Sequence, residues 1–531
     1  MQIPSKVRVD LFAAVFALVA YHCFFTGLAN VGLLGPDEPR YASIAREMAR
    51  SGDWVTPRLN GSPWFEKPPL YYWSAAIGFR EFSTPENAAR VPSGIYALLT
   101  VAGVALMAWR FYGRAVAIAA AFMLPATVAM TGFARAAATD MPFAACLTLT
   151  MVAAAFLLLD DRPAHSRLVA GAFGAALGLA MLAKGPAAIL LAGGSAGVWA
   201  IATGNLRRVW RLFNPVAVTV FAAVAMPWYV LCAARNPDFL RIFLLEHNVE
   251  RFLTNRYQHQ QPFWFFFPVI LLAVFPWTLL LIPALGDAWR ELRTAEWRES
   301  SGVYLAAWVL FPFVFFSASQ SKLPGYILPA IPPLVLLLAR AVAGSQQPAP
   351  PWRMLWISLT LIPMGLVPFV FSSSPNLARS ARLLLGIPGV LKPLALVGIV
   401  FLTCALLLAG SIWIRRAAVS IGFAAILFSF AIGLTANHIL PLLDSSISAR
   451  QLARTAAQEA GGAPIAVFKL PRAWQYGAEF YLDRALPEWT GAAPHPVYVL
   501  TTLSGYPELP KIAGEYVHLK SYGPAAIFRA P

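Results

Sequence analysis

The chain has 531 residues, of which 58% are hydrophobic and only 12% charged, a composition too apolar for a soluble globular protein of this length. The formal net charge of +16 comes from basic residues scattered among the expected loops, so it indicates membrane topology and anionic lipid groups, not nucleic acid. The four cysteines lie far apart, inside or at the edge of apolar runs, which argues against a disulfide framework and a cysteine metal site.

Long apolar runs recur along the first 440 residues. Each has about 17 to 25 residues, the length needed to cross a hydrocarbon core of roughly 30 Å. The first is expected to be an uncleaved anchor, because no small-residue cleavage site follows it and many further spans do. We expect a polytopic α-helical membrane protein with about thirteen spans: 11–29, 88–109, 115–131, 139–159, 168–183, 186–203, 213–233, 263–284, 302–318, 325–343, 354–373, 389–413 and 418–440.

The distribution of basic residues predicts the orientation of these spans. Arginines gather in alternate short loops, as the positive-inside rule requires if the N-terminus lies inside: Arg110 and Arg114, Arg162 and Arg167, Arg207, Arg208 and Arg211, Arg290, Arg293 and Arg298, and Arg415 and Arg416. An odd number of spans then places residues 441–531 outside. A helical stretch at 446–460 and β-rich runs at 465–468 and 497–501 predict a small α/β domain there.

The expected organisation is therefore a transmembrane domain, residues 1–440, followed by an outer α/β domain, residues 441–531. Two outer loops, 30–87 and 234–262, are unusually long, and long loops with structure of their own are commonly functional. Within the first loop, residues 40–51 are predicted to form a short amphipathic helix lying on the membrane.

Two acidic residues, Asp37 and Glu38, stand just beyond the outer end of the first span, before Pro39. An acidic residue here suits a helix N-terminus, so capping explains one of them. Capping accounts for Glu38 more readily than for Asp37, which leaves a functional role for Asp37 as plausible as a structural one.

A second motif in the same loop sets an acid and a base among aromatic residues. Glu66 and Lys67 follow Trp64 and Phe65 and precede two prolines. The alternative is an aromatic belt at the membrane interface with a snorkelling lysine. An adjacent Glu-Lys pair followed by two prolines is more rigid than a belt requires, which favours a functional site.

Single polar residues occupy the other outward turns: Arg135, Asp140, Lys184, Lys322 and Tyr326. Each by itself is more often an ordinary loop residue than a ligand. Basic residues are disfavoured in short outer loops, however, and a converging set of them would bind a phosphate or pyrophosphate.

The second long loop contains Glu246, His247 and Arg251. Adjacent Glu246 and His247 cannot form a helical two-ligand clamp, which needs a spacing of three or four, so a metal site would need a distant partner such as Glu66. A lone histidine is usually structural.

Together these motifs resemble the lipid-carrier-dependent glycosyltransferases of the GT-C class, in the aminoarabinose lipid A transferase branch of the protein mannosyltransferase superfamily. The resemblance covers the whole membrane part and rests on 37–42, 51–54, 65–69, 183–185, 246–251 and 321–329. It implies a donor sugar linked to undecaprenyl phosphate and inversion at the anomeric carbon.

The resemblance also implies roles for individual residues. Asp37 would be the catalytic carboxylate, and Lys67 and Arg251 would bind the carrier phosphate. Glu66 and His247 could hold a divalent ion that the chemistry does not require. The substrate pocket would be lined by Glu38, Arg40, Tyr41, Asp140, Lys184, Lys322 and Tyr326.

The leading hypothesis is transfer of 4-amino-4-deoxy-L-arabinose, or a related sugar, from undecaprenyl phosphate to lipid A at the periplasmic face of a bacterial inner membrane. A nearby alternative is hexose transfer to protein or another envelope glycan, because the motifs do not identify the acceptor. An alternative of another class is a transporter of lipid-linked sugars, which would place ionisable residues near the membrane midplane, often in two related halves. A non-catalytic scaffold would leave Asp37, Lys67 and Arg251 without a role.

Overall fold

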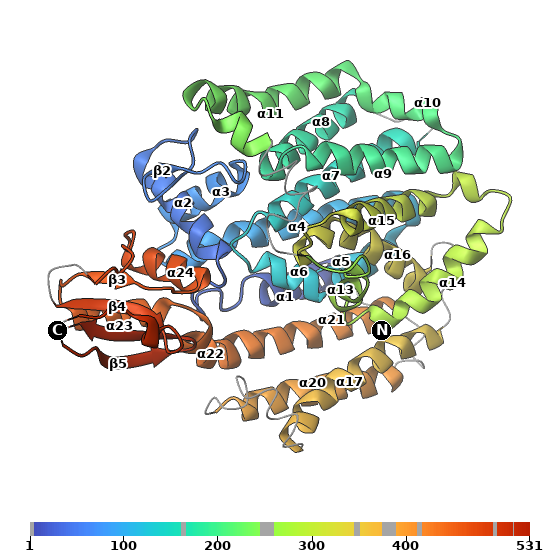
Figure 1. Ribbon diagram of the computed structural model, residues 1–531. Helices are drawn as coiled ribbons and strands as arrows, with labels where there is room; N and C mark the ends of the chain where they lie inside the picture. The colour runs from blue at the N-terminus through green and yellow to red at the C-terminus, as the bar shows by residue number, and fades with distance from the viewer. Residues whose placement is uncertain are drawn as a thin grey trace.

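The protein is mostly helical, with a small sheet in its C-terminal part (Figure 1). The computed structural model describes residues 5–160, 166–244, 260–344, 351–373, 389–410, 417–491, 496–512 and 514–530. Among these residues, eight helices are long and apolar enough to cross a membrane: α4 (Pro85–Tyr112), α7 (Asp140–Leu158), α8 (Ser166–Lys184), α11 (Pro215–Arg235), α15 (Ser301–Ala318), η5 with α16 (Pro324–Ala343), α20 (Leu391–Gly410) and α21 continuing into α22 (Val419–Ile447).

Two further spans are bent pairs of helices, which would raise the number to ten. α5 (Arg114–Met123) and α6 (Val128–Ala134) meet at 59°, and α13 (Phe266–Ala273) meets the stretch of η3 and α14 (Thr278–Leu292) at 111°. Pro125 and Pro276 lie at these breaks, where the missing N–H of proline interrupts a helix.

Three shorter apolar helices complete the set: 10–24 within α1 (Ser5–Phe24), α9 (Ala187–Thr203), and 354–369 within α17 (Met354–Ser373). Every one of the thirteen predicted spans overlaps one of these helices or bent pairs. Length and composition qualify eight to ten of them as spans, so the polytopic class is confirmed and the count of thirteen stays a prediction.

The first of the two long loops, which the sequence predicts to lie outside, is folded. It contains α2 (Asp37–Ser51), a hairpin of β1 (Arg58–Leu59) and β2 (Ser62–Pro63), and α3 (Leu70–Glu81). The apolar face of α2 packs in one core cluster with Tyr71, Tyr72 and Ala75 of α3. This face is covered by protein, so the prediction that the helix lies on the membrane was wrong: its amphipathic pattern reflects packing on α3.

The C-terminal part forms the predicted α/β domain. α23 (Arg450–Ala460) and α24 (Arg472–Leu482) accompany a four-stranded sheet of order β3-β4-β6-β5, made of β3 (Ile465–Val467), β4 (Val497–Thr502), β5 (Val517–Tyr522) and β6 (Ala525–Ala530). β3 and β4 are parallel and the other pairs antiparallel. The preceding helix runs unbroken to Ile447, so no break marks the predicted boundary at 440. α24 packs against α2, which joins this domain to the first outer loop (Figure 1).

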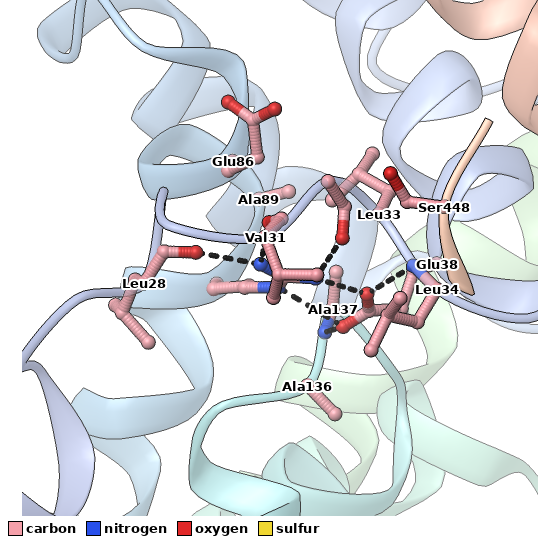
Figure 2. Close-up of polar contacts among 12 residues, drawn as sticks. Leu28, Val31, Leu33, Leu34, Glu38, Glu86, Ala89, Ala136, Ala137 and Ser448 are labelled. Atoms are coloured by element: carbon pink, nitrogen blue, oxygen red, sulfur yellow. Dashed lines mark hydrogen bonds and ion pairs between the residues drawn. The ribbon is translucent and has the colours of Figure 1, made fainter. Parts of the chain in front are cut away.

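A buried ion pair fixes the start of α2. The Glu38 carboxylate receives four hydrogen bonds: two from Arg90 of α4, at 2.5 and 3.2 Å, and one each from the backbone N–H groups of Leu34 and Ala137, both at 2.7 Å (Figure 2). Arg90 also donates to three backbone carbonyls, those of Leu28, Val31 and Gly32. Both charges are fully hydrogen-bonded, the condition under which burying a pair is tolerated.

We expect Glu38→Gln to lower the free energy of unfolding by about 3 to 5 kcal/mol, because it leaves a buried guanidinium uncompensated. Denaturant unfolding of the purified protein in detergent would measure it. The control is Arg50→Ala, which removes an ion pair to Asp483 whose arginine side chain is 62% exposed. That change should cost about 1 kcal/mol or less. Equal losses in both variants would contradict a special role for the Glu38–Arg90 pair.

Candidate functional site

Asp37 and Glu38 are adjacent but point to different surroundings. Glu38 is 7% exposed and turns toward Arg90, whereas the Asp37 side chain is 51% exposed at the first turn of α2. Consecutive helical residues are about 100° apart around the axis, so only one of the two can face the core. Asp37 is therefore the acid that remains available to a ligand.

Asp37 belongs to a group of charged side chains that we call the outer cluster: Asp37, Arg40, Glu66 and Lys67. Arg40 Nη2 lies 2.5 Å from Asp37 Oδ1, one turn along α2, and 3.1 Å from Glu66 Oε2. Lys67 Nζ lies 3.6 Å from Glu66 Oε1. The side chains of Arg40, Glu66 and Lys67 are 10–15% exposed, so solvent screens these charges only weakly.

The pKa of the Asp37 carboxyl is raised above its ordinary value of 3.8. Loss of hydration through burial is the main cause, and the negative charges of Glu66 and Asp140 act in the same direction. Arg40 and Lys67 lower the pKa and offset part of this rise. Asp37 is thus a carboxylate whose proton affinity is increased, as a general base requires.

A second group lies at the ends of α7 and α8. Lys184 Nζ donates to Asp140 Oδ1 at 2.6 Å and lies 5.3 Å from the ring centre of Tyr326. Gly325 presses against this pair, since a Cβ added there would lie 2.7 Å from Asp140 Oδ1. The charge of Asp140 also raises the pKa of Asp37, so this group lies within electrostatic reach of the outer cluster.

Two predicted pocket residues are engaged elsewhere. Lys322 is 6% exposed, and its ammonium group donates to the carbonyls of Ser319 at 2.5 Å and Gln261 at 3.1 Å. It therefore ties the end of α15 to the second outer loop. The Glu38 carboxylate is likewise occupied by its four donors. The geometry gives Lys322 and Glu38 structural tasks and does not favour substrate contact by either.

Tyr41 is buried, with its ring 6.1 Å from that of Tyr71 and 5.9 Å from that of Tyr72. It supports Arg40, whose guanidinium lies 5.2 Å from its ring centre. Tyr41 therefore forms part of the floor beneath the outer cluster.

The predicted phosphate and metal ligands of the second loop, Arg251 and His247, lie outside the described residues, as does Glu246. Glu66, the other predicted metal ligand, faces the cations of Arg40 and Lys67, which compete with a divalent ion. Among the described residues, no three side chains of His, Cys, Asp or Glu are grouped as metal ligands would be. This arrangement does not fit a metal ion at Glu66, and we assign no step to one.

Sequence reasoning gave no role to Trp64, Tyr72 or Tyr476, which lie around Arg40 or Glu66 of the outer cluster. Within the described ranges, Arg40 Nε, Trp64 Nε1 and the Tyr72 hydroxyl are buried without a hydrogen-bond partner. Unsatisfied buried donors are costly, and a polar ligand would satisfy them. The run of aromatic residues at 64–73 is the sequence feature that could have identified Trp64 and Tyr72 as part of the site. Tyr476, whose ring centre lies 5.7 Å from the Arg40 guanidinium, comes from α24, and no sequence motif marks it.

Residues 11–243 match the family described as dolichyl-phosphate-mannose-protein mannosyltransferase. The chain is 36% identical over 346 residues to undecaprenyl phosphate-alpha-4-amino-4-deoxy-L-arabinose arabinosyl transferase 1 of Pseudomonas fluorescens (strain Pf0-1), covering 64% of this chain and 59% of the relative. It is 35% identical over 331 residues to the transferase of Pseudomonas aeruginosa (strain LESB58), covering 61% and 58%. The chain thus matches less than two thirds of the length of these relatives.

The structural comparison covers nearly the whole chain. The crystal structure of ArnT from Cupriavidus metallidurans bound to undecaprenyl phosphate has a TM-score of 0.81 at 23% identity, with 99% of this chain and 98% of that chain covered. The apo state of the same protein has a TM-score of 0.79. This chain therefore has the same fold as ArnT, and its resemblance to the aminoarabinose transferases, predicted from the motifs, is confirmed.

Proposed function

We propose that this chain, which shares its fold with ArnT and matches the mannosyltransferase family over residues 11–243, is an inverting glycosyltransferase. It moves 4-amino-4-deoxy-L-arabinose from undecaprenyl phosphate to lipid A. The observation that carries the proposal is the outer cluster, where a half-exposed carboxylate, Asp37, is paired with Arg40, and Arg40 and Lys67 both lie against Glu66.

The donor is inferred from the relatives, which are undecaprenyl phosphate-alpha-4-amino-4-deoxy-L-arabinose arabinosyl transferases, and from the undecaprenyl phosphate bound in the ArnT crystal structure. The carrier phosphate is the leaving group, so negative charge grows on it in the transition state. Fixed cations in a poorly hydrated site stabilise that charge strongly. Lys67, with a side chain 15% exposed, is the described residue best suited to this task, and Arg251 is the second cation proposed for it.

In the reaction, an acceptor oxygen forms a bond to the anomeric carbon while the bond from that carbon to the carrier phosphate oxygen breaks. The electron pair leaves with undecaprenyl phosphate, and a single displacement inverts the configuration. If the acceptor is a hydroxyl, Asp37 takes its proton as general base. If the acceptor is a lipid A phosphate, the nucleophile is already ionised, and Asp37 orients it or binds the sugar amine.

We place this site on the periplasmic face of the inner membrane. Asp140 begins α7 at the site, and the other end of α7, about 28 Å away along a helix of 19 residues, is surrounded by arginines. Arg208 and Arg211 donate to the carbonyls of Leu158 and Leu157 there. The positive-inside rule assigns the arginine end to the cytoplasm and the Asp140 end to the periplasm.

The second candidate within this class, hexose transfer to protein or another envelope glycan, would use the same cluster. The transport alternative is less well supported, because Asp140 and Lys184 lie at the ends of α7 and α8, helices of 19 residues each, and not near the midplane, where transporter sites lie.

We expect Asp37→Asn and Lys67→Ala each to lower the rate of transfer by about a hundredfold or more, since each removes a group that acts on the reacting atoms. Transfer from synthetic donor to purified lipid A, followed by mass spectrometry, measures this, and immunoblots check that both variants reach the membrane. The matched control is Asp238→Asn, an exposed carboxylate whose partner is the surface residue Arg241. Full activity of Asp37→Asn would remove that residue from catalysis.

The raised pKa of Asp37 makes a prediction about pH. The carboxylate is the active form of a base, so kcat/KM for a hydroxyl acceptor should fall as pH falls through a value above 3.8, the ordinary pKa of aspartate. Initial rates across a pH series, in a range where the protein stays folded, provide the test. A rate that remains constant down to pH values where free aspartate titrates would count against Asp37 as the base.

A further inference from the structure

Residues 28–34, which we call the lead segment, lie in the connection between the end of α1 at Phe24 and the start of α2 at Asp37. They form neither helix nor strand, so their buried backbone groups need partners from elsewhere in the chain. The membrane domain supplies part of these partners. Arg90 donates to three carbonyls of the segment, and Glu38 accepts from the N–H of Leu34 (Figure 2).

The C-terminal part of the chain supplies the rest. The Gly32 N–H donates to Asp444 Oδ1 at 2.7 Å, and the Leu33 N–H donates to the Tyr481 hydroxyl at 2.8 Å. The Tyr481 hydroxyl in turn donates to Glu86 Oε1 at 2.8 Å. One phenol of α24 therefore links the lead segment to α4 across more than 390 residues of sequence.

Arg450 makes a second link. It donates to the carbonyls of Ala29 at 2.8 Å and Asn30 at 3.2 Å. Its charge is balanced by Glu86 at 3.2 Å and Asp444 at 2.9 Å, both of which are about 95% buried. Hydrogen bonds of this kind, charge-assisted and shielded from water, are stronger and geometrically more restrictive than neutral surface bonds.

The fit between the lead segment and the C-terminal part is close. A Cβ added at Gly32 would lie 2.6 Å from Ser448 Oγ and 2.8 Å from the Tyr481 hydroxyl. Glycine is therefore the residue that lets the segment approach these side chains. Asp37 stands three residues beyond the segment and is joined to it by Gly35 and Pro36.

We infer that the C-terminal domain positions the catalytic carboxylate: Tyr481 and Arg450 are positioning residues that hold the lead segment, and through it Asp37, in the geometry of reaction. This inference rests on the proposed transferase function. It gives the domain a task in the chemistry although none of these groups touches the reacting atoms. Displacements of about 1 Å at a reacting group are enough to slow a reaction about a hundredfold.

Tyr481→Phe tests the inference, because it deletes only the hydroxyl that links Leu33 and Glu86. Kinetics of the full-length protein in lipid nanodiscs should show kcat lowered by about tenfold or more, with KM for the donor changed less than about twofold. The matched control is Tyr516→Phe in the same domain, whose hydroxyl also makes two hydrogen bonds, to Trp489 and Pro510. Gly32→Ala, which pushes the lead segment away from Tyr481, should reproduce the loss of kcat.

Equal kcat in Tyr481→Phe and Tyr516→Phe, with Gly32→Ala unimpaired, would overturn the inference. A loss of kcat that matches the loss of folded protein, measured by thermal unfolding of the same samples, would overturn it too. Asp37→Asn assayed in parallel separates the two proposals. If Asp37→Asn is inactive and Tyr481→Phe has an unchanged kcat, only the positioning inference is refuted. If Asp37→Asn is fully active, the proposed role of Asp37 itself is refuted.

Discussion

The arrangement of the site depends on the buried ion pair between Glu38 and Arg90. Two opposite charges can be buried only when nearly all their hydrogen-bonding groups are satisfied, and here the backbone of the lead segment and Ala137 provides the additional partners. The Coulomb attraction of the pair contributes little net stability, because removing both charges from water costs a similar free energy. We infer that the main effect of the pair is specificity of geometry, because the lead segment, α2, α4 and the turn before α7 meet at this pair.

This constraint explains why two neighbouring acids have different tasks. With Glu38 directed inward, the helical rotation places Asp37 at the surface of α2, beside Arg40 and within electrostatic reach of Glu66 and Lys67. The carboxylate is then partly dehydrated but accessible, and its pKa is raised. A structural residue and the proposed catalytic residue are thus neighbours in the sequence, and the buried Glu38 determines the position of Asp37.

Much of this organisation can be predicted from the sequence. The apolar runs predict the helices, the spacing of Tyr41, Ile44, Ala45 and Met48 predicts α2, and the motifs around Asp37 and Lys67 identify the outer cluster. The sequence could not tell which acid would be buried, since that depends on Arg90, 52 residues away. Nor could it show that Lys322 binds backbone carbonyls, because an outer-loop lysine has the same sequence signal whether its partner is a carbonyl or a phosphate. The contributions of Tyr476, Tyr481 and Arg450 come from contacts over hundreds of residues, and no local pattern encodes such contacts.

The most direct test of the account is the mass spectrum of lipid A from three strains: one with this protein, one lacking it, and one carrying Asp37→Asn at normal membrane levels. The account predicts that the mass of an aminopentose is present on lipid A in the first strain and absent in the other two. Identical lipid A in all three strains, under conditions in which the protein is expressed, would contradict transfer to lipid A.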